Sequence, residues 1–410
     1  MSEYYDKLET RSADQRAKDL AKELPAIIAR AKASAPAYAT LLADHDPAEI
    51  TGPEALAGLP LTRKNELIER QAADPPYAGL TTIPTGDLAC IYQSPGPIYD
   101  AEGRTSDYWR VARALFAAGF RKGDILHNCF AYHFTPAGAM IQTGAGALGC
   151  AVVPAGPGQT EQQIQAIRDV RPTGYAGTPS FLKIILEKAD EMGEALPSLK
   201  RALVAGEALF PAVRQGFADR GIEVCQFYGT ADLGSIAYES EARDGLIVDE
   251  GVIVEIVRPG TGQPVAEGEV GEVVVTTTAR AYPLIRFATG DLSCLLPGDS
   301  PCGRTNRRLK GWMGRADQGT KIKGMFVHPP QVAAIVSRHP EVTRARLVVT
   351  GENNTDIMTL VCETGAGSDT LRDALAASVR AVTKLGARID FTTPGALPND
   401  GIVIEDARKG

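Results

Sequence analysis

Apolar residues recur at helical spacing in the first part of the chain. A helix is expected over residues 12–34, because leucine, isoleucine and alanine return every three or four positions. The residues of this stripe are Leu20, Leu24, Ile27, Ile28 and Ala31. Similar patterns predict helices over residues 108–120 and over residues 62–73, where Thr62 is the expected N-cap.

Short apolar runs alternate with amphipathic segments from about residue 125 onward. The expected strands are 124–129, 150–154, 174–177, 201–204 and 224–228. The expected helices are 135–148, 160–170, 180–192 and 211–220. Strand–helix alternation of this kind predicts a parallel sheet with helices on both faces.

The pattern changes after residue 245. Two runs separated by a Pro-Gly-Thr-Gly turn, 252–257 and 271–276, predict antiparallel strands in a β-rich subdomain over about 245–310. The last unit has expected helices at 330–337 and 368–383 and expected strands at 344–349, 358–363 and 387–391. We therefore expect an α/β chain with a large N-terminal domain, 1–316, and a small α+β lid domain, 317–410.

Charge and composition exclude several classes of protein. The 410 residues carry a formal net charge of -7 without a Lys/Arg-rich run, so no nucleic-acid partner is expected. The smoothest apolar stretch, 138–156, is broken by Gln142, Thr143 and several glycines, and predicts no membrane span. The seven cysteines are scattered and no signal peptide is recognisable, so a reducing cytoplasm is the expected location.

One segment with candidate chemistry, Tyr228-Gly229-Thr230-Ala231-Asp232, directly follows a predicted strand. An α/β protein binds ligands at the carboxyl ends of its parallel strands, so we expect a ligand here. The carboxylate of Asp232 is an oxygen ligand of the kind that Mg²⁺ prefers. The alternative for Asp232 is a helix N-cap in a connecting loop.

Two further segments carry candidate contacts for a nucleotide. In Ala205-Gly206-Glu207, the glycine lacks a Cβ atom, so a flat ring can approach the backbone closely. Asp291 ends the run 287–291, and its carboxylate can accept both hydrogen bonds of a ribose diol. The alternatives are a turn glycine beside a solvated glutamate and a tight Thr-Gly-Asp turn.

Two glycine-containing segments lie outside these strand ends. Residues 314–324 are dense in charge, which is typical of a hinge, although an exposed linker has the same pattern. Residues 94–100 form a turn-rich segment between a predicted strand and a predicted helix. Two prolines there remove N–H donors, which makes it a poor phosphate loop. No GxxxxGK[ST], HExxH or GxSxG motif occurs, which disfavours Walker NTPases, zinc proteases and α/β-hydrolases.

The order of these segments resembles the adenylate-forming (acyl-CoA synthetase-like) superfamily. Within it, the chain is similar to the phenylacetate–CoA ligase family, as a divergent member. Further similar stretches are 123–128, 149–154, 158–161, 167–172, 178–180 and 283–286. The resemblance implies that an aryl or acyl carboxylate attacks ATP to give an acyl-adenylate. A small mobile C-terminal domain then rotates, and the thiol of coenzyme A displaces AMP.

The resemblance also implies roles for single residues. The nucleotide site would comprise Ser94, Gly206, Glu207, Tyr228, Gly229, Thr230, Asp291 and Arg315. In it, Tyr228 stacks on the adenine near Glu207. Asp291 binds the ribose hydroxyls, and Arg315 approaches ribose or phosphate. Asp232 coordinates Mg²⁺ at a position where relatives usually have glutamate.

Other implied roles concern the second step and the acid. Asp317 would be the hinge, and Lys321 and Lys323 would face the thiol. The acid pocket is expected to be an apolar cleft lined by Phe130, Tyr132, Phe134 and Ala205. A homodimer is expected only by analogy with the family.

Two positions depart from the family's pattern. The phosphate loop expected at 94–104 carries Asp100 and Glu102, which repel phosphate. The family's catalytic lysine follows a glycine near the C-terminus, but here Gly401 is followed by Ile402. Two functions therefore stay open: an AMP-forming acid–CoA ligase, and a divergent member that binds nucleotide, adenylate or CoA with little or no adenylation. An amine or a carrier-protein thiol is a third option for the acceptor.

Overall fold

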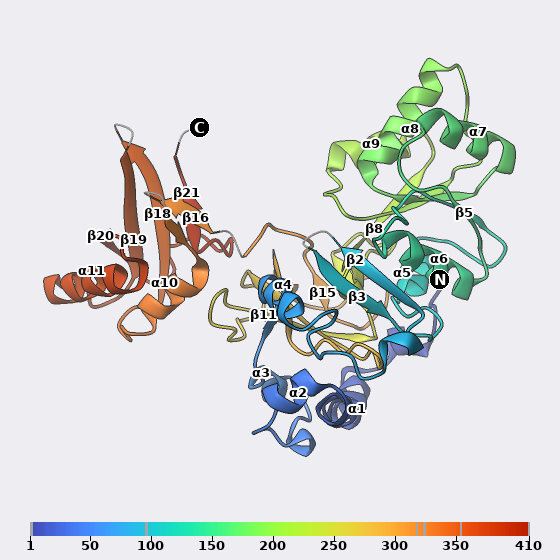
Figure 1. Cartoon of the computed structure of the whole chain (residues 1–410). Helices are drawn as coiled ribbons and strands as arrows, with labels where there is room; N and C mark the ends of the chain where they lie inside the picture. The colour runs from blue at the N-terminus through green and yellow to red at the C-terminus, as the bar shows by residue number, and fades with distance from the viewer. Residues whose placement is uncertain (1–2, 95–96, 317–318, 323–324, 353–354, 409–410) are drawn as a thin grey trace. The chain divides into compact units, whose positions relative to one another are not determined.

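The computed structural model describes residues 3–94, 97–316, 319–322, 325–352 and 355–408. The chain divides into two compact units (Figure 1). The first comprises Met1–Val254, Val275–Phe287 and Leu296–Gly311, and the second comprises Glu255–Val274, Ala288–Leu295 and Trp312–Gly410. The expected α/β class is confirmed, with several sheets. The expected domain limits, 1–316 and 317–410, stay a prediction.

Helices open the first unit. They are the 3-10 helix Lys7–Thr10, α1 (Ala13–Ser34), α2 (Pro36–Leu41), the 3-10 helix Pro47–Glu49 and α3 (Pro53–Ala57). Ser12 caps α1, because its hydroxyl oxygen accepts a hydrogen bond from the Gln15 N–H at 3.1 Å. Leu24, Ile27 and Ile28 of the predicted apolar stripe are buried, so this helix is confirmed.

Helix α4 (Lys64–Ala73) begins two residues later than the pattern predicts. The prediction of Thr62 as its N-cap is wrong, because Thr62 lies in the short strand β1 (Thr62–Arg63). The Thr62 N–H donates to the Arg286 carbonyl at 3.0 Å, so a contact far along the chain decides where this helix starts. Lys64 consequently stands at the first position of α4.

The largest sheet has nine strands in the order β14-β15-β10-β9-β8-β7-β6-β4-β5. Five of them pair in parallel, as the alternation predicts: β4 (Ile125–Asn128), β5 (Ala151–Pro154), β6 (Gly174–Gly177), β7 (Arg201–Val204) and β8 (Glu223–Thr230). The strands β9 (Gly234–Tyr238), β10 (Leu246–Val248) and β15 (Arg308–Leu309) continue the sheet in antiparallel pairs. The short strand β14 (Leu295–Leu296) ends the order.

Helices connect the parallel strands. They are α6 (Ala137–Leu148), α7 (Thr160–Val170), α8 (Pro179–Glu191) and α9 (Pro211–Ala218), close to the predicted limits. Residues of α7, α8 and α9, including Ile167, Leu182 and Phe217, share one buried core with Tyr175 and Val204 of the strands. Figure 1 shows these helices together beside the parallel strands.

Helix α5 (Val111–Ala117) is shorter than the predicted helix over 108–120. Asp107 and Arg110 adopt left-handed backbone angles, φ 49° and 61°, which cannot continue a right-handed helix. The Asp107 carboxylate accepts hydrogen bonds from the N–H groups of Val111, at 2.8 Å, and of Ala112, at 3.1 Å. These bonds start the helix late, in the way an N-cap residue does.

The buried Asp107 carboxyl predicts a pH-dependent stability. Burial raises its pKa to about 6, against the opposing hydrogen bonds from Val111 and Ala112. The folded chain therefore holds this proton more tightly than the unfolded chain, and the associated stability, roughly 3 kcal/mol, is present below about pH 4 and lost as the pH rises through about 6. We expect urea unfolding to show that the free energy of unfolding of Asp107→Asn, relative to that of the wild type, is higher at pH 7 than at pH 4. An unchanged difference between the two proteins would contradict this assignment.

Residues 90–102 form a hairpin that the sequence does not predict. After the 3-10 helix Thr85–Asp87, the strands β2 (Cys90–Ser94) and β3 (Ile98–Glu102) pair in antiparallel fashion. The pairing includes Ser94 opposite Ile98 and Tyr92 opposite Asp100. The expected loop before a helix is therefore wrong here, because cross-strand pairing extends to the end of β3.

The expected β-rich subdomain over 245–310 is divided between two sheets. Strands β11 (Val252–Val257), β12 (Gly271–Thr277) and β13 (Phe287–Ser293) follow β1 in the order β1-β13-β12-β11. Strands β10 and β15 belong instead to the nine-stranded sheet. Sequence patterning predicts the strands but not the sheet to which each belongs.

The end of the second unit is an α+β layer. The strands β16 (Thr320–Ile322) and β17 (Met325–Val327) form one small sheet, and β18 (Arg344–Glu352), β19 (Thr355–Glu363), β20 (Arg388–Thr392) and β21 (Ile404–Asp406) form another in the order β20-β19-β18-β21. Helices α10 (Pro329–Val336) and α11 (Asp369–Thr383) lie side by side against the larger sheet (Figure 1). Val332, Leu375 and Val379 of the helices share its core with Leu347 and Leu360.

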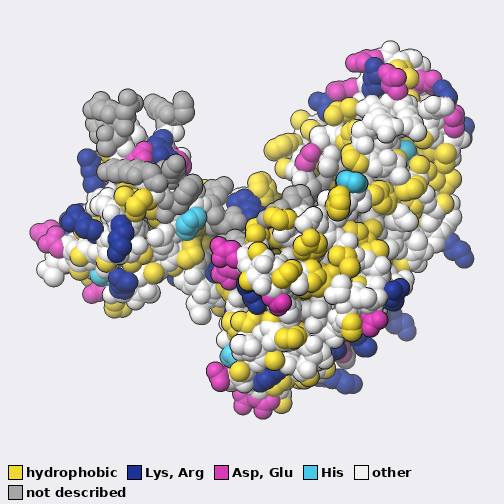
Figure 2. Space-filling view, in the orientation of Figure 1, with side chains coloured by type: hydrophobic (Ala, Val, Ile, Leu, Met, Phe, Trp, Pro, Cys, Tyr) yellow, Lys and Arg dark blue, Asp and Glu magenta, His cyan; other side chains and the backbone are white. Residues whose placement is uncertain are grey.

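The visible surface carries side chains of both charge signs between hydrophobic and uncharged ones (Figure 2). Among the described residues, no helix has the length and apolar character that a membrane crossing requires.

Candidate functional site

The parallel strands of the first unit end at one edge of the sheet. The chain runs from β4 outward to β5 and then returns to β6 on the other side of β4, so the strand order reverses between β4 and β6. In open α/β sheets such a switch point creates a crevice outside the carboxyl ends of the strands. The segments that follow β4, β6, β7 and β8 carry most of the predicted site residues in this unit.

The segment after β7 holds Glu207 against the start of α8. The Glu207 carboxylate accepts hydrogen bonds from the Ser180 hydroxyl at 2.8 Å and from the Ser180 N–H at 3.3 Å. Gly206 has φ +82°, a conformation that glycine adopts without strain. Ala205 is buried at the end of the strand. At this edge of the sheet, the backbone of Gly206, which has no side chain, therefore lies beside the hydrogen-bonded carboxylate of Glu207.

The end of β8 turns sharply into β9. Tyr228 and Gly229 flank an irregularity in the register of the two strands. A Cβ atom added to Gly229 would lie 2.5 Å from the Gly234 carbonyl oxygen, so only glycine allows this approach. The Thr230 hydroxyl accepts the Leu233 N–H at 3.2 Å and closes the turn that carries Asp232. Because a strand follows this turn, the alternative of a helix N-cap for Asp232 is wrong.

Asp232 forms an ion pair that the sequence analysis missed. Its side chain is fully buried, and one oxygen, Oδ2, lies 2.5 Å from the ammonium nitrogen of Lys64. The other oxygen, Oδ1, has no hydrogen-bond partner in the described part of the chain. Lys64 is 168 residues away in sequence, and a single lysine at a helix start gives no signal that could have identified it.

A second buried carboxyl, Asp100 on β3, lies next to this pair. Burial, followed by the charge of Asp232, raises the pKa of Asp100 well above its usual range, while the Ser94 side chain and Lys64 act in the opposite direction. Asp100 is completely buried, and the Ser94 side chain forms a hydrogen bond with its carboxyl group. The predicted nucleotide contact Ser94 is also buried, and its hydroxyl lies 3.4 Å from the Ile98 carbonyl.

The residues proposed for the acid pocket follow β4. Phe130 and Tyr132 are half-buried, whereas Phe134 is 64% exposed. The Tyr132 hydroxyl oxygen accepts a hydrogen bond from the Asn128 amide at 2.7 Å, which ties this loop to the end of β4. The loop thus begins at the switch point, and its outermost ring faces solvent.

The second unit contains a separate group of site residues. The Asp291 carboxylate oxygen Oδ1 accepts hydrogen bonds from Arg315, at 2.9 Å, and from the Trp312 indole N–H, at 3.1 Å. Asp291 lies within β13, so the alternative of a tight turn is wrong. A backbone bridge joins Asp291 to Arg315, and Ala316 N–H donates to the Gly290 carbonyl at 2.6 Å. Trp312 was missed, because a single tryptophan in a glycine-rich stretch carries no site pattern.

The remaining predicted residues of this unit are only partly described. Lys321 lies in β16, paired with Phe326 of β17. The predicted hinge Asp317 and the predicted thiol-facing Lys323 lie outside the described residues. No group of three or more His, Cys, Asp or Glu side chains in the described ranges is placed to hold a metal ion.

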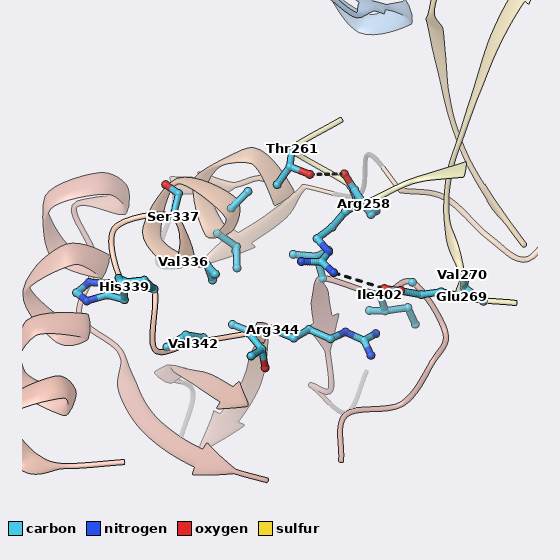
Figure 3. A pocket seen from close by; sticks show the side chains of 18 residues that line it. Arg258, Thr261, Glu269, Val270, Val336, Ser337, His339, Val342, Arg344 and Ile402 are labelled. Atoms are coloured by element: carbon cyan, nitrogen blue, oxygen red, sulfur yellow. Dashed lines mark hydrogen bonds and ion pairs between the residues drawn. The ribbon is translucent and has the colours of Figure 1, made fainter. Parts of the chain in front are cut away.

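A cavity of about 310 Å³ lies within the second unit (Figure 3). Its apolar lining includes Val336, Val342 and Ile402, and Arg258 lies 3.7 Å from Glu269 at its side. Ile402 occupies the position where the resemblance implies a lysine. The Val270 N–H donates to the Asn399 side chain at 2.9 Å and the Arg344 guanidinium to the Pro398 carbonyl at 2.8 Å, which holds the segment before Ile402.

Known proteins agree with the family resemblance. Residues 105–281 match the family described as AMP-binding enzyme. A phenylacetate-coenzyme A ligase from Thermus thermophilus is 33% identical over 372 residues, covering 86% of this chain and 82% of the relative. Another from Escherichia coli is 37% identical over 237 residues, covering 55% of this chain and 54% of the relative.

The fold also matches a solved structure. A 2-hydroxyisobutyryl-CoA ligase in the postadenylation state superposes with a TM-score of 0.72 at 24% sequence identity, covering 97% of this chain and 91% of that chain. At this identity the likeness concerns the fold.

Proposed function

Because the chain belongs to the phenylacetate–CoA ligase family of adenylate-forming enzymes, we propose that it activates an aryl or acyl carboxylate with ATP and transfers the acyl group to coenzyme A. The observation that supports this most is the Asp291 carboxylate, oriented by Arg315 and Trp312. A carboxylate oriented in this way is a strong acceptor for the two hydroxyls of a ribose. For the acid substrate, we propose its chemical class, an aryl or acyl carboxylate.

The first unit carries a further group of residues to which the resemblance assigns contacts with the nucleotide. Tyr228, Gly229 and Thr230 end β8, and Gly206 and Glu207 follow the neighbouring strand β7. In the proposal, the adenine stacks on Tyr228 near Glu207. The acid lies toward the half-buried loop after β4, which is next to the switch point of the sheet.

The proposed first step forms a mixed anhydride. A carboxylate oxygen of the acid bonds to the α-phosphorus of ATP, and the bond to pyrophosphate breaks. Arg315 would neutralise charge that develops on the phosphate, which is the role of oriented cationic groups in such sites. Asp232 would hold Mg²⁺, whose charge stabilises phosphate oxygens, and its buried oxygen without a partner fits a hard cation.

The proposed second step consumes the acyl-adenylate. The sulfur of coenzyme A bonds to the acyl carbon, and AMP leaves with the electron pair of the broken carbon–oxygen bond. We include in the proposal a rotation about Asp317 that brings Lys321 and Lys323 to the thiol. Assembly as a homodimer in the cytoplasm also stays a proposal.

A second candidate function is adenylate or CoA binding with little adenylation. Ile402 follows Gly401, so no ammonium group stands at the position where the resemblance implies the catalytic lysine. Asp100 is buried in a hairpin at the position of the expected phosphate loop. Both observations concern the first step and leave the thioester step intact.

Exchange of labelled pyrophosphate into ATP tests the first step directly. We expect Mg²⁺-dependent exchange with at least one acid from a panel of aryl and short acyl carboxylates, well above a control without acid. The preferred acid would also give hydroxamate when hydroxylamine traps the adenylate. The absence of exchange with every acid, together with retained binding of AMP, would reject the full ligase and favour the second candidate.

A further inference from the structure

The cavity in the second unit has walls from several parts of the chain (Figure 3). They include the turn after β11, helix α10 with the loop that leads into β18, and the segment 401–403 before β21. At about 310 Å³ its volume lies in the range of small-molecule sites, roughly 300–1,000 Å³. Among the described residues that line it, none is one to which the resemblance assigns a contact with nucleotide, acid or thiol.

Close contacts within the chain hold these walls together. Gly260, in the turn after β11, has φ +85°, and a Cβ atom there would lie 3.0 Å from the Pro329 carbonyl oxygen, so the turn packs closely on α10. The Asn399 side chain accepts the Val270 N–H at 2.9 Å and donates to the Gly268 carbonyl at 3.1 Å. The chain itself therefore fixes the shape of the cavity, which lowers the cost of ordering when a ligand binds.

One side of the cavity is apolar. Val332 and Val342 line it and are 2% and 5% exposed. Val336 follows Val332 by one turn of α10, so both side chains lie on the same face of the helix. These side chains favour a ligand with an apolar body, because the complex removes apolar surface from water.

Arg344 brings a positive charge to the cavity. Within the described ranges its guanidinium has no carboxylate partner, and it donates to the carbonyl oxygens of Leu397, at 3.4 Å, and Pro398, at 2.8 Å. Glu363 lies opposite Arg344 in the paired strands β18 and β19, but its Oε1 accepts the Leu397 N–H at 2.8 Å. A guanidinium has five N–H donors, so Arg344 keeps donors and charge for a ligand.

Arg258 adds a second guanidinium from another wall. It lies 3.7 Å from Glu269, which is longer than a hydrogen bond, and its side chain is 49% exposed. In Figure 3, Arg258 and Arg344 extend toward the side of the cavity where Ile402 lies. Among the described lining residues, two guanidiniums and one carboxylate leave an excess of one positive charge on this side. The charge therefore favours an anion, and guanidinium groups match the geometry of a carboxylate.

We propose that this cavity is a second small-molecule site, which binds a monocarboxylate with an apolar body. Its carboxylate would lie between Arg344 and Arg258, and its body against the valines of α10 and of the loop before β18. A ligand with a second charge is disfavoured, because that charge would be buried against valine side chains. The ligand belongs to the same chemical class as the acid of the proposed function, but its site is separate and requires no nucleotide.

Nuclear magnetic resonance of isoleucine δ1 methyl groups in the full chain, without ATP or coenzyme A, tests the proposal. Ile402 lines the cavity, and Ile402→Val removes its δ1 signal and so assigns it. We expect phenylacetate to shift this signal saturably. Phenylacetamide has the same body without the charge, and acetate has the charge without the body. Each should bind at least about tenfold more weakly than phenylacetate.

Substitutions of Arg344 separate its charge from its packing. Arg344→Met keeps the aliphatic stem and should weaken the binding of phenylacetate at least about tenfold, whereas Arg344→Lys keeps the charge and should lose less than about fivefold. Arg380→Met is the matched control, because Arg380 is an exposed arginine of α11 outside the cavity lining. It should bind phenylacetate as the wild type does.

Three results would overturn the proposal. They are an Ile402 signal that phenylacetate does not shift, equal affinity for phenylacetamide, and unchanged affinity in both Arg344→Met and Arg258→Met. The last result would assign the shift to an acid bound elsewhere in the chain. Since no ATP is present, the measurement is independent of adenylation. A retained Ile402 shift without pyrophosphate exchange would reject the proposed function alone.

Discussion

Replacing Asp291 by alanine is expected to weaken the binding of AMP about 100-fold. In the proposed function its carboxylate accepts both ribose hydroxyls, and each hydrogen bond to a charged group contributes about 1.5–3 kcal/mol. A loss of roughly 3 kcal/mol corresponds to the expected factor of 100. Arg315 and Trp312 also lose the acceptor that they share in the unliganded chain. Isothermal titration calorimetry with AMP measures the effect.

Two further variants separate ribose binding from local damage. Asp291→Asn keeps one acceptor oxygen and should lose about tenfold in affinity, because a neutral acceptor makes weaker bonds. Trp312→Phe removes the 3.1 Å bond to Asp291 but keeps the carboxylate, so it should lose less than fivefold. AMP affinity of Asp291→Ala within threefold of the wild type would reject Asp291 as the ribose ligand.

Replacing Glu9 by alanine is expected to lower the free energy of unfolding by about 3–5 kcal/mol, the usual effect of breaking a buried ion pair from one side. Glu9 is 1% exposed and accepts hydrogen bonds from the Tyr238 hydroxyl at 2.6 Å and from Arg304 Nε at 3.0 Å. Arg304 is also 1% exposed, so its guanidinium would stay buried without this counter-charge. The network joins the start of the chain to residues more than 200 positions away.

Urea unfolding followed by tryptophan fluorescence measures this loss. Lys183→Ala provides the contrast, because Lys183 and Glu187 form an exposed pair at 3.6 Å whose removal should cost less than about 0.5 kcal/mol. If Glu9→Ala lost less than about 1 kcal/mol, the buried network would not stabilise the fold as its geometry indicates.

The sequence by itself determined the local elements and their class. Helix α7 has the predicted limits, 160–170, and β6 and β7 have the predicted limits 174–177 and 201–204. The physical reason is that burial on one face imposes a period of 3.6 on helices, and burial on both faces gives short apolar runs in parallel strands. Such patterns are local, so they can be recognised without knowledge of the fold.

The order of short motifs along the chain determined the family and part of the candidate site. It identified Asp291 and Arg315 as neighbours of one nucleotide, and the structure has them in contact at 2.9 Å. It also identified Tyr228 and Glu207, which lie at the carboxyl edge of neighbouring strands. The roles of these residues stay a prediction.

Only the tertiary structure decided which distant side chains meet. Strand β3 pairs with β2 in a sheet separate from that of β8, yet its buried Asp100 lies close enough for the charges of Asp232 and Lys64 to act on it. Read along the chain, Asp100 is a charge in a degenerate loop and Lys64 is an ordinary helix residue. Their significance arises from burial and from contacts across 168 residues, and neither property is encoded in a local pattern.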